Sequence, residues 1–162
     1  MLDIHKCFEY NIHKVNILKR FRLFSLILSF SALLLGLIIY TAFREHTYIN
    51  SFIPDFIESK IKSCFGFLPE KSFIDFMKYY FADFLWCFAL NSALCAVQSS
   101  ISVKKLTAVS LASFAVGFAF EILQLFSVCI GTFDPADICM YLAASVISVV
   151  INIIFLKREG LL

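Results

Sequence analysis

The stretch LFSLILSFSALLLGLIIYTAF, Leu23 to Phe43, carries no charged residue. A helix that crosses the hydrocarbon core of a bilayer needs about 20 mostly apolar residues. This stretch meets that requirement, so the sequence predicts a transmembrane helix over residues 23–43. A cleavable signal peptide is the rival interpretation, because KRFR precedes the run. The run is too long for a signal peptide and no A-x-A cleavage site follows it, so a retained anchor is expected.

The whole chain is unusually apolar. Of its 162 residues, 60% are hydrophobic and 20 are Phe, whereas only 16% are charged. A soluble domain has roughly a quarter of its residues charged, and a small domain keeps much of its surface in water. The net charge of +2 is small and no basic patch is interleaved with aromatic residues, so nucleic acid is not expected as a partner. The expected solvent is a bilayer.

Three further apolar runs have the length of membrane spans, at residues 79–98, 106–126 and 138–156. The first is interrupted by Asp83 and Asn91, the second contains Glu121 as its only charge, and the third contains none. The predicted fold is therefore an all-α, helical integral membrane protein with a four-span transmembrane bundle. The expected organisation is a membrane domain at residues 23–156 between tails at 1–22 and 157–162.

The Lys and Arg residues indicate how the spans are oriented. They gather in three segments that alternate with the spans: the first tail (Lys6, Lys14, Lys19, Arg20, Arg22), the second connection (Lys104, Lys105) and the C-terminus (Lys157, Arg158). The third connection, residues 127–137, contains no Lys or Arg, and the first, residues 44–78, has as many acidic as basic residues. Because basic segments stay in the cytoplasm, both termini are expected to be cytoplasmic.

The first connection contains a helical pattern of its own. Ile53, Ile57 and Ile61 recur every four residues, while Pro54 suits a first turn and Gly66 a stop. The pattern predicts an amphipathic helix from about Pro54 to Phe65 that lies in the plane of the membrane interface. A helix packed on the outer end of the bundle fits the same spacing.

Polar residues follow one face of each later span. The third span carries Thr107, Ser110, Ser113, Gly117, Glu121 and Gln124, and the fourth carries Asp137, Tyr141, Ala144, Ser148 and Asn152. Small residues at such spacing are typical of close helix packing. An ionisable residue inside a membrane instead indicates function. We therefore expect the small residues on these faces to serve helix packing and the acids to serve a function.

The acids are expected to meet at the outer face. Asp83, Glu121, Gln124 and Asp137 can converge in one outward-facing pocket, with no Lys or Arg inside the spans to pair them. Three states are open: protonated acids, carboxylates that share protons, or carboxylates that hold a cationic ligand. Arg44 and Lys78 are the cations within reach. For Asp134, followed by Pro135, capping of the fourth helix is an equally good interpretation.

The cysteines indicate no metal site or cofactor. Cys7, Cys64, Cys87, Cys95, Cys129 and Cys139 form no CxxC pair and no zinc spacing. Cys87 and Cys95 lie in an apolar run, where Cys behaves as a small hydrophobe. Any disulfide among Cys64, Cys129 and Cys139 cannot be read from spacing.

The motif Glu121-x2-Gln124, followed by Thr132-Phe133-Asp134-x2-Asp137 and a helix of small residues, resembles the signature of the VanZ-like membrane protein family. Asp83-Phe84-Leu85-Trp86 resembles it more loosely. The family consists of compact bacterial helical membrane proteins, and one member is associated with resistance to teicoplanin. This chain departs from the pattern at three positions: Gly131 replaces an Arg, Tyr141 an Asn and Ala144 a Gly.

The resemblance implies a multi-pass protein of the bacterial plasma membrane with a role in the cell envelope or in glycopeptide tolerance. Its partner would be a membrane lipid head group or another envelope component. The candidate binding residues are Asp83, Trp86, Glu121, Gln124, Asp134, Asp137 and Tyr141.

Two other classes of function are kept beside this one. A membrane enzyme would use Glu121 and Asp137 as acid and base, although His5, His13 and His46 lie outside the spans and no G-x-S-x-G motif is present. A proton-coupled transporter subunit would use the acids as a relay, and with so few spans it would have to form a homo-oligomer.

Overall fold

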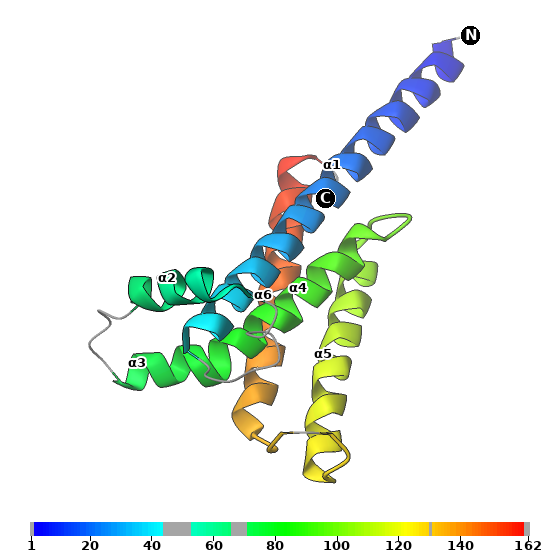
Figure 1. Cartoon of the computed structure of the whole chain (residues 1–162). Coiled ribbons are helices and arrows are strands. Elements are labelled where there is room, and N and C mark those ends of the chain that lie inside the picture. Colours follow the sequence, from blue (N-terminus) through cyan, green and yellow to red (C-terminus); the bar gives the residue numbers. More distant parts are fainter. Residues whose placement is uncertain (1, 44–52, 66–70, 130, 161–162) are drawn as a thin grey trace.

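The computed structural model describes residues 2–43, 53–65, 71–129 and 131–160, with side chains from Val15 onwards. Within these residues all regular secondary structure is helical, without a strand. The elements are α1 (Leu2–Phe43), α2 (Asp55–Phe65), α3 (Lys71–Phe76), the π-helix η2 (Met77–Phe81), α4 (Ala82–Ala96), α5 (Val103–Leu125) and α6 (Pro135–Arg158) (Figure 1).

Three helical segments are long and apolar enough to cross a membrane: Val15–Phe43, Val103–Leu125 and Pro135–Arg158. They correspond to the predicted spans at 23–43, 106–126 and 138–156. In a soluble protein such surfaces would be covered, but here large apolar side chains such as Phe30, Leu111 and Val146 are more than half exposed. The all-α membrane class is therefore supported by the structure.

The predicted span at 79–98 does not form one helix of that length. The α-helix α4 has 15 residues, about 22 Å at 1.5 Å per residue, which is shorter than the roughly 30 Å hydrocarbon core. Before it, residues 77–81 widen into the π-helix η2, and after it the chain turns at Val97. The backbone is nevertheless helical throughout from Lys71 to Ala96, through α3, η2 and α4.

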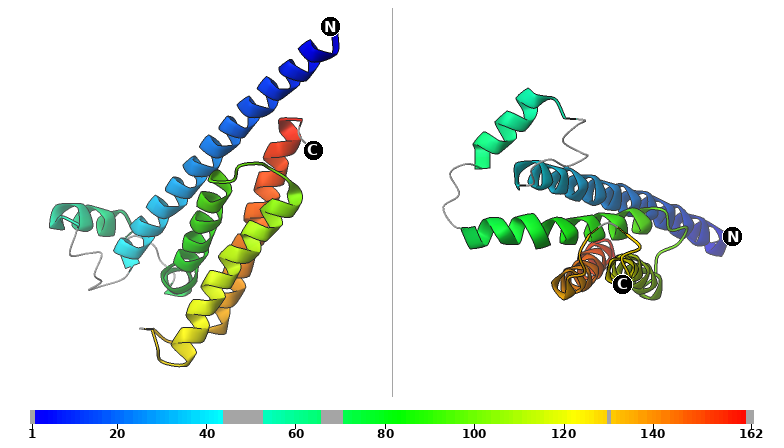
Figure 2. Two further views of the ribbon diagram at one scale, coloured as in Figure 1. Left: turned by 90° about the vertical axis from the view of Figure 1, so that its right-hand side faces the viewer. Right: turned by 60° about the horizontal axis from the view of Figure 1, so that its bottom comes forward.

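Residues 2–22 continue the first predicted span without a break. The helix α1 has 42 residues and is about 63 Å long. Its N-terminal part extends beyond the other helices (Figures 1 and 2). The segment expected as a tail is thus helical from Leu2 to the start of the span.

The helix α4 lies at the centre of the bundle. It packs on α1 on one side and on α6 and α5 on the other, while α5 and α6 run beside each other (Figure 2). Hydroxyl groups tie these interfaces: Ser29 Oγ donates to Ala89 O at 2.9 Å, and Ser110 Oγ donates to Ser145 O at 2.9 Å. Ser113, Ala144 and Ser148 are also buried, as expected where helix backbones approach closely.

A polar seam joins α4 to α6 in the interior. Asn91 Oδ1 accepts a hydrogen bond from Ser148 Oγ at 3.0 Å, and Asn152 Nδ2 donates to Ser148 O at 2.8 Å. All three side chains are at most 1% exposed. The Asn152–Ser148 bond lies within α6, whereas the Ser148–Asn91 bond crosses from α6 to α4, as side-chain hydrogen bonds between helices do in an apolar solvent. This pairing gives the inner parts of α4 and α6 a defined register.

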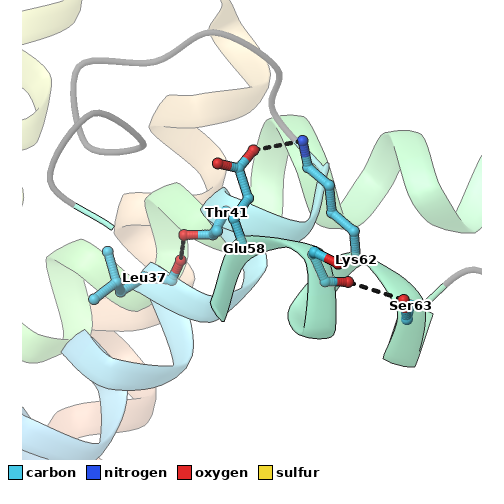
Figure 3. Close-up of polar contacts among 6 residues, drawn as sticks. Leu37, Thr41, Glu58, Lys62 and Ser63 are labelled. Atoms are coloured by element: carbon cyan, nitrogen blue, oxygen red, sulfur yellow. Dashed lines mark hydrogen bonds and ion pairs between the residues drawn. The ribbon is translucent and has the colours of Figure 1, made fainter. Parts of the chain in front are cut away.

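The helix α2 occupies the stretch where isoleucine spacing predicts a helix. It has no buried residue, and the Phe65 ring packs against Phe43 of α1 with centroids 5.4 Å apart. Figure 3 shows its ion pair from Lys62 Nζ to Glu58 Oε1 at 2.6 Å, close to the last turns of α1. A partly exposed pair within one helix contributes little to stability.

The two ends of the bundle differ in charge. At one end, Arg22 donates through Nη2 to Gln98 O at 2.9 Å, and Arg20 Nη1 lies 3.4 Å from Glu159 Oε2. These contacts bring the end of α6 and the α4–α5 connection beside the same part of α1, so one end gathers Lys19, Arg20, Arg22, Lys104, Lys105, Lys157 and Arg158. The predicted site acids Asp83, Glu121, Asp134 and Asp137 lie at the opposite end, the acidic end of the bundle.

Candidate functional site

A cavity of about 350 Å³ lies between α4, α5 and α6 at the acidic end of the bundle. Four of the predicted binding residues line it: Asp83, Trp86, Gln124 and Tyr141. The remaining wall is formed by Cys87, Leu90, Ser113, Val116, Gly117 and Phe120. The structure therefore places one carboxylate, one amide and three aromatic rings around a single space.

Helical spacing explains which side chains reach the cavity. On α4, Asp83, Cys87 and Leu90 recur at steps of four and three, which places them on one helical face. On α5, the lining residues follow the same spacing from Ser113 to Gln124. The two faces diverge toward the acidic end, where the cavity lies.

Glu121 is not part of the cavity wall. Its side chain is 1% exposed. Its Oε2 accepts the backbone N–H of Asp134 at 3.1 Å, and its Oε1 accepts the Tyr141 hydroxyl at 3.4 Å. Both carboxylate oxygens are thus used to hold the α5–α6 connection and the start of α6 against α5. This is a structural role beside the site.

Asp134 is the N-cap of α6. Its Oδ1 accepts the backbone N–H of Ala136 at 2.9 Å, and Pro135 occupies the first turn. Of the two interpretations, the geometry shows the cap. The hydroxyl of Tyr80, from η2, also lies beside this carboxylate. Asp137 is half-buried in the first helical turn, and its backbone N–H donates to Asp134 O at 3.1 Å.

We expect Asp134→Ala to destabilise the protein by about 1 kcal/mol, because the Ala136 N–H loses its acceptor. Asp134→Asn should be nearly neutral, since the amide oxygen can still cap. Thermal unfolding in detergent would measure both. A loss equally large for Asn and Ala would mean that the charge of Asp134, rather than its cap, stabilises the fold.

Tyr141 connects α6 to α5 through Glu121 and Gly117. Its hydroxyl is within electrostatic reach of Asp83, Glu121 and Asp137. Its ring lies directly on Gly117 of α5, where an added Cβ would be only 2.7 Å from Tyr141 Cδ2. The absence of a side chain at position 117 is what allows the ring to lie between α5 and α6 and to form one wall of the cavity.

Gln124 lies against Gly131, where the family pattern has an Arg. Gly131 has a φ of +136°, and a Cβ there would be 2.6 Å from Gln124 Nε2. A φ of this sign favours glycine, so the backbone of this chain does not suit an Arg at 131. Of the cations expected near the acids, Lys78 has its Nζ 5.1 Å from the centroid of the Tyr79 ring. Arg44 lies outside the described residues.

The sequence interpretation missed several lining residues. Cys87 was expected to be a small hydrophobe in the core, and it is buried, with its thiol 3.7 Å from Tyr141 O. It also forms part of the cavity wall, with Leu90 and Phe120. The sequence signal that could have identified these residues is their helical spacing, since they lie at steps of three and four residues from Asp83 and Gln124. Cys64, Cys129 and Cys139 are free thiols.

The arrangement suits a cation with apolar surroundings. A carboxylate attracts a positive charge, and the faces of aromatic rings add to this attraction within about 6 Å. Binding cavities typically have mostly apolar walls and a few polar groups that orient the ligand. Asp83, Gln124 and Tyr141 are those polar groups here.

Comparison of the chain with family models, with curated proteins and with solved structures gave no match. The resemblance to VanZ-like proteins rests on the motif residues described above.

Proposed function

We propose that the protein is a VanZ-like, multi-pass protein of the bacterial plasma membrane that binds the ammonium group of an envelope component at its outer face. The observation that carries this proposal is the cavity in which Asp83 lies among Trp86, Phe120 and Tyr141. A lipid head group is the favoured source of the ammonium group, because the cavity belongs to a helical bundle with apolar outer surfaces.

The proposed topology has four crossings. The continuous helical run from Lys71 to Ala96 is about 39 Å long, which is enough for a crossing when η2 is included. The basic end of the bundle is assigned to the cytoplasm, so both termini are inside and the cavity faces outward. The helix α2 then lies along the outer surface, where its exposed Phe56 and Ile57 can contact the membrane interface.

This topology predicts a labelling pattern. In variants that retain one cysteine each, Cys64 of α2 should react with an impermeant thiol reagent added to intact cells, because it is exposed and outside. Cys7 should react only after the cells are broken. Labelling of Cys7 in intact cells would overturn the orientation and, with it, the outward-facing site.

The enzyme and transporter alternatives have less support. Glu121, the acid that either would use, has both carboxylate oxygens engaged by Asp134 and Tyr141 and does not reach the cavity. A general acid or base must reach the proton it transfers. To transfer a proton to a ligand, Glu121 would have to leave its two partners. Ligand binding by Asp83 leaves Glu121 in place.

Trp86 offers a direct test, since it is the single tryptophan of the chain and lines the cavity. We expect glycerophosphoethanolamine, a soluble ammonium head group, to change the Trp86 emission in a saturable manner in uncharged detergent. Asp83→Asn should weaken the interaction at least tenfold, because the amide keeps the shape but removes the charge.

The matched control is Asp75→Asn, which removes one carboxylate from α3, outside the cavity wall. It should leave the titration unchanged. An equal response of the wild type and Asp83→Asn, or no response of the wild type at any concentration, would contradict the proposal.

A further inference from the structure

We infer that the ligand of the Asp83 cavity is an aminophospholipid whose head group lies at Asp83 and one of whose acyl chains follows the groove between α4 and α5. This inference rests on the proposed function and adds the class of ligand. It comes from how the lining residues are distributed along the length of the cavity.

The cavity is elongated along the helix axes. Its α5 wall extends from Ser113 to Gln124, about 16 Å. Its α4 wall extends from Asp83 to Leu90, about 10 Å. A small cation alone would occupy only one end of such a space.

The polar groups are concentrated at one end of this space. Asp83, Gln124 and Tyr141 lie at the acidic end of the bundle, where α4 begins and α5 ends. Toward the other end the wall is formed by Leu90 and Val116 together with Ser113.

The deep polar groups of the wall already have partners within the protein. Ser113 Oγ donates to Val109 O at 3.0 Å, and the Cys87 thiol lies 3.8 Å from Ser145 Oγ. The part of the groove beside Leu90 and Val116 therefore favours an apolar ligand group, because a polar group there would lose its hydrogen bonds to water.

A ligand that fits both the polar end and the apolar end of the cavity is an amphiphile. A cationic group at Asp83 and an apolar chain beside Leu90 and Val116 belong to one molecule when the two regions form a single cavity. A lipid of the outer leaflet has this order of groups along the membrane normal, with its head group at the outer end. Val116 and Phe120 are 44% and 52% exposed, so a chain can reach the groove from the side of α5.

Trp86 can report the chain as well as the head group. Bromine atoms on an acyl chain quench tryptophan fluorescence on contact. We would incorporate the protein into phosphatidylglycerol vesicles that contain a small fraction of phosphatidylethanolamine with brominated chains. The expected result is saturable quenching of Trp86 that unbrominated phosphatidylethanolamine reverses.

Two pairs of variants complete the test. Asp83→Asn should reduce the affinity for the brominated lipid at least tenfold, and Asp75→Asn should not. Val116→Phe, which fills the groove, should abolish the saturable quenching. Val146→Phe makes the same change beside a different groove, between α5 and α6, and should have no effect.

The outcomes separate this inference from the proposed function. If glycerophosphoethanolamine binds in an Asp83-dependent manner but brominated phosphatidylethanolamine quenches no more than brominated phosphatidylglycerol, the head-group site stands and the acyl-chain site is overturned. If brominated phosphatidylglycerol quenches saturably and Asp83→Asn has no effect, the groove holds chains without selecting an ammonium group, and both ideas fail.

Discussion

Glu121→Ala is expected to destabilise the protein by about 2 to 4 kcal/mol, the largest effect of any single side-chain truncation near the site. The change removes both acceptors that Glu121 provides, so the Asp134 N–H and the Tyr141 hydroxyl lose their partners at once. It also leaves a void at a position that is 1% exposed. Thermal unfolding in detergent or nanodiscs measures the loss.

Glu121→Gln is the informative comparison. The amide oxygen can accept the Asp134 N–H, and the amide nitrogen can donate to the Tyr141 oxygen, since a phenol both donates and accepts. We therefore expect the Gln variant to lie within about 1 kcal/mol of the wild type and to keep the Trp86 response to the head group. A Gln variant that is stable but no longer binds would place the charge of Glu121 in the binding site.

A control outside the network is Leu123→Ala, on the same helix and 37% exposed. It should cost less than Glu121→Ala, because this side chain is partly exposed and takes no part in the hydrogen bonds of Glu121. A loss as large as that of Glu121→Ala would show that α5 is sensitive to any truncation. The hydrogen bonds of Glu121 would then not explain its effect.

The membrane spans could be predicted from the sequence wherever the length of an apolar run is enough to define a span. Residues 23–43, 106–126 and 138–156 are long apolar runs, and each lies in a helix of spanning length. The run at 79–98 looks similar in composition, but it begins within the π-helix η2 and its α-helical part is short. A π-turn adds a residue to the turn without a reliable sequence signal, so the boundary could not be predicted.

The candidate site, too, could be predicted from the sequence only in part. Spacing grouped Asp83 and Trp86 with Asn91, and Gln124 with the small residues of α5, because residues three and four apart share a helical face. Asp83, Trp86 and Gln124 line the cavity, whereas Asn91 is buried against Ser148. It could not separate Glu121 from the cavity. That separation depends on how the connection after α5 folds back, through a positive φ at Ser127 and at Gly131. These backbone angles bring the Asp134 N–H to Glu121, and they are properties of the folded loop.

Gly117→Ala is expected to be the second large effect, because the two glycines of the helical spans have opposite environments. At Gly117 an added Cβ would lie 2.7 Å and 2.8 Å from two Tyr141 ring atoms, which is far inside ordinary contact. Cγ stays in place when the ring turns about its own axis, so the whole Tyr141 ring has to be displaced. At Gly36 the nearest atom to an added Cβ is Leu85 Cβ at 3.6 Å, which is normal packing.

Replacing a helical Gly by Ala gains about 1 kcal/mol of helix propensity where space permits. Gly36→Ala should therefore be neutral or stabilising. Gly117→Ala should lose about 1 to 3 kcal/mol from overpacking despite the same gain. Since the displaced ring also leaves Glu121 and the cavity wall, only Gly117→Ala should weaken the Trp86 response to the ammonium head group. If the two variants unfold at the same temperature, the close approach of α5 to Tyr141 does not hold the cavity in shape.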